Sequence, residues 1–145
     1  MSPCIVRLLE AKSGLGLSYE SIGSELQRSE VWTAALFWGQ ASATIDEVYK
    51  LAELLKLEFE EISELVNCPI KGSVNEDYKF DPVIYRLYEI VHVYGVPMKE
   101  IIHEKFGDGI MSAIDFEMSI DRETKEGEQR VKVTMSGKFL PYRRW

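Results

Sequence analysis

The sequence is poor in cysteine, in positive charge and in long apolar runs, and each shortage excludes a class of protein. Its two cysteines, Cys4 and Cys68, stand far apart among 145 residues, and His92 and His103 complete no ligand spacing with them, so we expect reduced thiols and no metal site. No apolar run approaches the roughly 18 residues that a membrane span needs. The N-terminus lacks the basic and apolar regions of a secretory signal. These shortages favour a cytoplasmic protein without a membrane partner.

Basic residues are outnumbered: 17 lysines and arginines face 24 aspartates and glutamates, and the formal net charge is −7. The excess of acid lies mainly in residues 1–79. A general nucleic-acid binder needs a basic footprint, and neither half of the chain supplies one. We therefore expect no nucleic-acid partner.

The first half of the chain, from residue 5 to about residue 67, predicts a series of short helices. Ser18, Ser29 and Thr44 stand where N-caps belong, because their side-chain oxygens can accept hydrogen bonds from free backbone N–H groups. Apolar residues then recur at helical spacing on two segments: Val48, Leu51, Ala52, Leu54 and Leu55 on the first, and Phe59, Ile62, Leu65 and Val66 on the second. The pattern predicts a bundle of five helices.

A tight turn near residues 27–29 gives this bundle a resemblance to the helix-turn-helix of phage repressors. Its role would be either DNA binding, with residues 29–38 as the recognition helix, or structural packing. A recognition helix should offer Arg, Lys, Asn or Gln to base edges, whereas this one offers Val31, Trp32, Ala34, Ala35, Leu36 and Phe37. We favour the structural role. A repressor-like DNA-binding protein with a C-terminal dimerisation domain stays as the alternative function.

A change of composition predicts two domains. Residues 68–77 contain a proline, a glycine and small polar residues without periodicity, which is typical of a linker. We therefore expect a helical domain at 1–75 and a second domain at 76–145.

The second domain begins with a predicted pair of helices. Asp81 can cap a helix that has Pro82 at its first position, a favoured arrangement. We expect that helix to stop at Gly95. A second helix should run from Pro97 to about Phe106.

After Ser112 the apolar residues alternate with polar ones, which predicts a β-hairpin whose strands are joined by a charged loop at 122–129. The fold class is therefore α+β: a five-helix bundle, then two helices and a hairpin. So small a second domain buries little apolar surface alone, and a lone hairpin is marginal in water. Its free strand edges also invite pairing, so we expect an obligate oligomer.

Arg86 and Glu89 lie on one face of the predicted helix. A surface ion pair of little energetic value would account for them. However, the helix is apolar nearly all round, which indicates burial, and a buried guanidinium suits an anion. Ser112 follows a Gly-Asp-Gly loop and has neither the nucleophile elbow nor the His–Asp partners of a hydrolase. It is either the start of a strand or a hydrogen-bond donor to a small anion.

Four stretches of the chain resemble one enzyme family. Residues 81–95, DPVIYRLYEIVHVYG, and 102–114, IHEKFGDGIMSAI, are similar to cyanase, also called cyanate hydratase or cyanate lyase; TAALFWGQ at 33–40 and SGKFLP at 136–141 match further motifs. The family's catalytic Arg and Glu, in Tyr-Arg-x-Tyr-Glu, and its Ser, in Gly-Asp-Gly-Ile-x-Ser, fall at Arg86, Glu89 and Ser112. His92 stands where the family more usually has glutamine.

The resemblance implies a lyase that decomposes cyanate with bicarbonate as co-substrate. The products are carbamate and carbon dioxide, and carbamate then gives ammonia and a second carbon dioxide. It implies no metal or organic cofactor. It also implies a homodecamer of five dimers, in which the C-terminal domains of each dimer are intertwined and the sites form where subunits meet.

Overall fold

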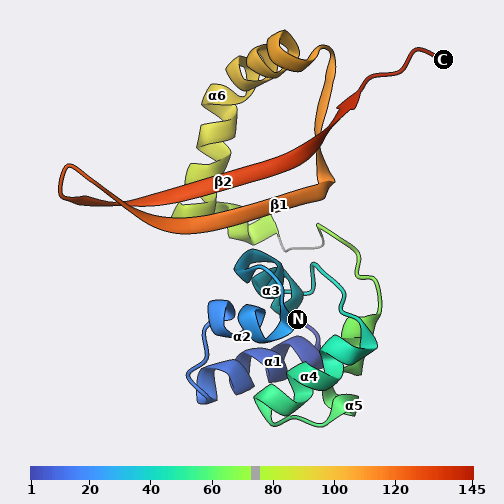
Figure 1. The fold of residues 1–145 in the computed structure, drawn as a ribbon. Coiled ribbons are helices and arrows are strands. Elements are labelled where there is room, and N and C mark those ends of the chain that lie inside the picture. Colours follow the sequence, from blue (N-terminus) through green and yellow to red (C-terminus); the bar gives the residue numbers. More distant parts are fainter. Residues whose placement is uncertain (73–75) are drawn as a thin grey trace. The chain divides into compact units, whose positions relative to one another are not determined.

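The computed structural model describes residues 1–72 and 76–145, and the chain divides after residue 73 into two compact units (Figure 1). The predicted linker spans this division, and its residues 73–75 lie outside the described residues. The domain boundary expected after residue 75 stays a prediction. Within the two described ranges, no helix is both long and apolar enough to cross a bilayer.

The N-terminal unit is built from short helices whose starts were predicted. They are α1 (Pro3–Gly14), α2 (Tyr19–Leu26), α3 (Glu30–Phe37), α4 (Ile45–Leu55), α5 (Phe59–Ile62) and the 3-10 helix η1 (Ser63–Val66). The side chains of Ser18, Ser29 and Thr44 accept N–H groups of the first turns of α2, α3 and α4 at 3.0, 3.1 and 3.3 Å. These three N-caps confirm the predicted helix starts.

The core of this unit is formed by apolar side chains from all its helices: Cys4, Ile5, Leu8, Ile22, Leu26, Leu36, Phe37, Ala41, Ala43, Val48, Leu51, Ala52, Leu55, Ile62 and Leu65. Val66 was predicted to face inward, and this was wrong, because its side chain is 36% exposed. The cause is the 3-10 geometry of η1, which has three residues per turn. Ile62 and Leu65 therefore share a face, and Val66 turns away from it.

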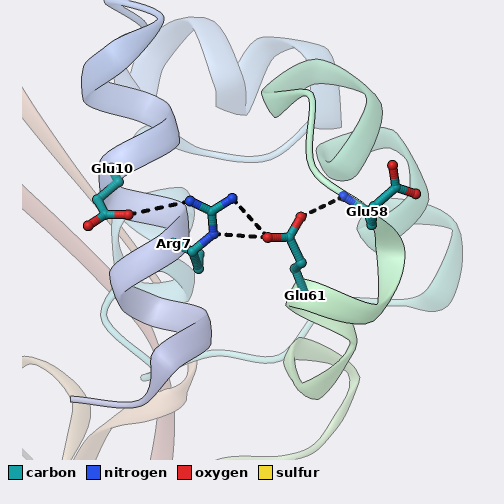
Figure 2. A network of polar contacts seen from close by, with 4 residues as sticks. All are labelled: Arg7, Glu10, Glu58 and Glu61. Carbon is teal, nitrogen blue, oxygen red and sulfur yellow. Dashed lines mark hydrogen bonds and ion pairs between the residues drawn. The ribbon is translucent and has the colours of Figure 1, made fainter.

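Arg7 on α1 links two elements of the N-terminal unit (Figure 2). Its Nε and Nη2 atoms lie 2.9 and 2.8 Å from Oε1 of Glu61 on α5, and its Nη1 lies 3.5 Å from Oε2 of Glu10. The other oxygen of Glu61 accepts the backbone N–H of Glu58 at 2.9 Å. That hydrogen bond, and then the Arg7 guanidinium, lower the pKa of Glu61. The carboxylate is thus held in its charged form between α1 and α5.

The C-terminal unit contains the 3-10 helix η2 (Glu76–Phe80) and one long helix, α6 (Pro82–Phe106). The predicted break at Gly95 and the separate helix from Pro97 were wrong, since α6 is one helix (Figure 1) and Pro97 lies inside its bounds. A proline removes one N–H from the helical ladder but has a φ that the helix accepts. The turns on either side keep their other hydrogen bonds, and the helix continues.

The hairpin that follows is longer than expected. Strands β1 (Gly109–Lys125) and β2 (Glu128–Pro141) pair antiparallel as far as Lys125 opposite Glu128. The charged loop predicted at 122–129 was therefore wrong: the connection is the two-residue turn Glu126-Gly127, with φ of 54° and 79°. Positive φ at both positions matches the turn type whose twist suits a hairpin. Charged side chains on an exposed ribbon point into water, so they do not prevent strand pairing.

Candidate active site

Arg86 and Glu89 lie near the start of α6. The helix begins at Asp81, whose Oδ1 accepts the N–H groups of Val83 and Ile84 at 2.9 and 3.2 Å. Nη1 of Arg86 donates to Oε2 of Glu89 at 2.9 Å, and the two side chains are 68% and 50% exposed. Arg86 and Glu89 thus form an exposed ion pair in a single chain. The apolar faces of the helix had predicted that the two side chains would be buried, and a single chain does not bury them.

Aromatic side chains flank this pair. Tyr85 and Tyr88 line a shallow, open hollow with Lys79 and Phe80. The Arg86 guanidinium carbon lies 5.7 Å from the centre of the Tyr85 ring, within the range of a cation–π contact. The exposed guanidinium thus stands beside an apolar surface.

The turn that follows α6 is held by His103. Gly107, at φ 89° and ψ −176°, ends the helix in a conformation that essentially only glycine adopts. Nε2 of His103 lies 3.1 Å from the Gly109 carbonyl oxygen, and Nδ1 lies 3.6 Å from Oδ1 of Asp108. A carbonyl can only accept, so Nε2 carries the hydrogen. The Tyr142 N–H donates to the Asp108 carbonyl at 3.0 Å, which closes the turn from the far end of β2.

The role of His103 was missed at the sequence level, where it was considered only as a metal ligand. It ties the end of α6 to the first residue of β1, three residues before Ser112. The residues next to His103 in the IHEKFGDGI stretch do not predict this role, because the contact between His103 and the Gly109 carbonyl depends on the path of the turn.

Ser112 lies in an irregular part of β1. The pairing passes from Met111 opposite Phe139 to Phe116 opposite Gly137, so residues 112–115 bulge out opposite a single residue of β2. Within this bulge, Oγ of Ser112 accepts the backbone N–H groups of Ile114 and Asp115, both at 3.0 Å. Ser112 is only 5% exposed.

One chain does not assemble the three predicted residues. Among the described residues, Ser112 makes no hydrogen bond to Arg86 or Glu89. The pair belongs to the start of α6, and the serine belongs to the bulge beyond its other end.

The two cysteines and the possible metal ligands are other reactive groups in the described part of the chain. Burial, and then the negative charge of Glu64, raise the pKa of the Cys4 thiol to about 12, so it is an unreactive core residue. Cys68 is exposed and unpaired by a disulfide. Over residues 1–72 and 76–145, no cluster of three or more His, Cys, Asp or Glu side chains is arranged to hold a metal ion.

Comparison with known proteins gives consistent matches. Residues 76–144 match the family described as Cyanate lyase C-terminal domain. The chain is 50% identical over 145 residues to the cyanate hydratase of Synechocystis sp., with 100% of this chain and 97% of the relative covered. It is 52% identical over 138 residues to the cyanate hydratase of Trichormus variabilis, with 95% and 94% covered. Its fold is similar to the crystal structure of cyanase from T. urticae, with a TM-score of 0.83, 38% identity and 95% and 96% of the two chains covered.

Proposed function

The chain belongs to the cyanate hydratase family, and on that premise we propose that it is a lyase that decomposes cyanate with bicarbonate as co-substrate. The observation that carries this proposal is the 50% identity to a cyanate hydratase over the whole chain. In the reaction, a bicarbonate oxygen attacks the cyanate carbon, the nitrogen takes up one proton from outside and the hydrogen that bicarbonate carried, and loss of carbon dioxide leaves carbamate. Carbamate then takes up a second proton and breaks down to ammonia and another carbon dioxide.

Arg86 is the proposed anion-binding residue. Cyanate and bicarbonate repel each other, and Arg86 side chains from neighbouring subunits, each with a fixed positive charge, would neutralise and orient the two anions. Holding two reactants in contact can supply a large part of a rate enhancement. The exposure of Arg86 in one chain supports this role, because its remaining N–H groups are open to a ligand.

Glu89 is the proposed partner of Arg86 and the candidate for proton transfer. Its 2.9 Å hydrogen bond fixes the direction of the guanidinium. A positioned carboxyl group can also move a proton to the developing nitrogen. The two roles predict different kinetic effects of a Glu89→Gln change.

Ser112 is proposed to donate a hydrogen bond to the negative charge that develops during the attack. Its oxygen already accepts two N–H groups. A hydroxyl has two acceptor positions and one donor, so the O–H is what it can offer to an anion. This geometry supports a donor and disfavours a nucleophile.

The proposed active form is a homodecamer of five dimers with intertwined C-terminal domains. Support comes from the uncovered apolar surface of α6, on which no residue is buried. Val83, Val91 and Val96 are 61–71% exposed, and Tyr85, Tyr88 and Tyr94 are more than half exposed. So many apolar side chains in water mark an interaction surface. A second copy covering them would also be able to bring a Ser112 toward another chain's Arg86.

The N-terminal unit is proposed to be a helix-turn-helix-like bundle with a structural role. On α3, Thr33, Leu36 and Phe37 are buried in the bundle core, and the helix has no basic residue with which to approach phosphates. This supports the enzyme over the repressor-like alternative.

One assay tests the proposed function. Gel-filtered protein is incubated with cyanate, with and without bicarbonate, and released ammonia is measured while light scattering reports the mass of the assembly. We expect ammonia only when both anions are present, from a particle of ten chains. Equal release without bicarbonate, or none with it, would contradict the proposal. Salt-sensitive binding to duplex DNA would instead support the alternative.

A further inference from the structure

Gly137 on β2 lies directly against the bulge that carries Ser112. A Cβ atom at position 137 would collide with the backbone carbonyl oxygen of Ser112. It would also stand 2.6 Å from Cγ of Met111 and 3.3 Å from Cδ2 of Phe116. A side chain such as methionine can move aside, but a backbone carbonyl cannot do so without moving its residue. Position 137 therefore admits only glycine while Ser112 keeps its present place.

The same bulge fixes the direction of the Ser112 hydroxyl. The N–H groups of Ile114 and Asp115 donate to Oγ of Ser112. These two hydrogen bonds occupy both acceptor positions of that oxygen. The hydroxyl is therefore oriented by the path of the backbone from 112 to 115. That path in turn depends on how closely β2 can approach at Gly137.

We propose that Gly137 is a positioning residue for Ser112: its missing side chain lets β2 hold the bulge in the shape that aims the hydroxyl. This inference rests on the proposed function, because it matters for turnover only if Ser112 contacts the reacting anions. Alanine at 137 would push the Ser112 carbonyl away and turn the hydroxyl with it. A displacement on the order of 1 Å at a reacting centre can lower a rate about 100-fold.

A double-mutant cycle tests this proposal. The rate of ammonia release is measured for the wild type, Gly137→Ala, Ser112→Ala and the double variant, all at the same assembly size. We expect Gly137→Ala to lower kcat about 10- to 100-fold when Ser112 is present and less than about twofold in the Ser112→Ala background, since coupled residues are not additive. Where Ser112→Ala releases no measurable ammonia, the four proteins are compared by the rise in melting temperature that saturating bicarbonate produces.

Gly14→Ala is the matched control. A Cβ atom at Gly14 would meet nothing within 4 Å, so the same exchange there should leave the rate of ammonia release unchanged. A comparable loss in Gly14→Ala would show that the effect is general to glycine replacement and would overturn the assignment of Gly137.

The outcomes separate this inference from the function on which it rests. Full turnover by Ser112→Ala would remove Ser112 from the proposed site. Two results would overturn the inference and leave the function standing. In the first, Ser112→Ala is impaired but Gly137→Ala is not. In the second, Gly137→Ala causes an equal loss of rate with and without Ser112.

If Gly137→Ala does not assemble, Asp115→Pro carries the test. It removes one N–H that orients the Ser112 hydroxyl and leaves β2 untouched, while Asp115→Ala keeps that N–H and serves as the baseline. We expect Asp115→Pro to lose turnover relative to Asp115→Ala only when Ser112 is present. Equal turnover of the two would show that the shape of the bulge does not matter, and the role of Gly137 would fall with it.

Discussion

The Arg86 guanidinium donates to the Glu89 carboxylate at 2.9 Å across one turn of α6, with both side chains at least half exposed. In water such a pair contributes only about 0–1 kcal/mol to stability. The pair lies beside Tyr85 and Tyr88 on an uncovered apolar helix. In the proposed assembly, a second copy would cover this surface, and the same charges would then lie in a site with little water.

Arg86→Leu should lower the rate of ammonia release by about 100-fold or more, because it removes the charge that is proposed to stabilise the reacting anions in the transition state. Assembly should persist, since leucine suits the apolar surface of α6. Steady-state rates and light scattering check both points. Arg7→Leu removes another arginine of an i,i+3 pair, with Glu10 at 3.5 Å, and also its contact with Glu61. It should lower stability but leave the rate of the folded protein unchanged, because Arg7 belongs to the N-terminal unit. Full activity of Arg86→Leu would exclude Arg86 from the site.

Glu89→Gln should lower kcat by about 10²–10⁴-fold if the carboxyl group moves a proton, with little change in KM. If Glu89 only orients Arg86, the KM values for cyanate and bicarbonate should rise instead. Measuring both parameters separates the roles. Glu10→Gln removes the equivalent acid from the control pair and should leave both parameters unchanged.

Val91→Glu should disrupt the proposed assembly. Val91 is 61% exposed in one chain, and a second copy covering it would bury the new charge without a partner, which is strongly unfavourable. Light scattering should show particles smaller than the wild type. Ammonia release should fall with the size if the site is shared between copies. A full-sized, active variant would place Val91 outside any interface.

Glu61→Gln should destabilise the protein in a pH-dependent way. The pKa of Glu61 is lowered first by the Glu58 N–H and then by Arg7. Its charge therefore contributes stability above the unfolded-state pKa of about 4.3, and this contribution is lost as the pH falls through the folded-state value. At constant protein concentration, the melting temperature should be lower than that of the wild type at pH 7, and the difference should shrink as the pH falls below the unfolded-state pKa. Glu60→Gln is the neighbouring control, and a pH-independent difference would contradict the role of the charge.

Cys4 should resist alkylation in the folded protein. Burial and the charge of Glu64 raise its pKa to about 12, so at pH 8 the reactive thiolate is roughly one part in ten thousand. Peptide mass spectrometry after iodoacetamide treatment should find Cys4 labelled only after denaturation, while the exposed Cys68 is labelled more readily. Rapid labelling of native Cys4 would show that α1 opens frequently.

The sequence predicted local features well where a few adjacent residues decide the structure. Ser18, Ser29 and Thr44 cap helices as expected, because a cap depends only on a side chain and the next three N–H groups. It failed at Pro97, where the unbroken turns on either side outweigh one lost hydrogen bond. The prediction also failed at the hairpin tip. The charged residues there predicted a loop, but an exposed two-stranded ribbon accepts charged side chains on both faces.

For the candidate site, the sequence determined the chemical groups: a fixed cation and a carboxylate one helical turn apart at Arg86 and Glu89, and a hydroxyl after a Gly-Asp-Gly turn at Ser112. These follow from residue identity and spacing, which a chain has before it folds. Only the tertiary structure decided that the Ser112 oxygen accepts two N–H groups and that a Cβ atom at position 137 would collide with the Ser112 carbonyl oxygen. The two N–H contacts are local to residues 112–115, but the strand register creates the bulge and brings position 137 against it. That register joins residues more than twenty positions apart, which meet only when β1 and β2 pair.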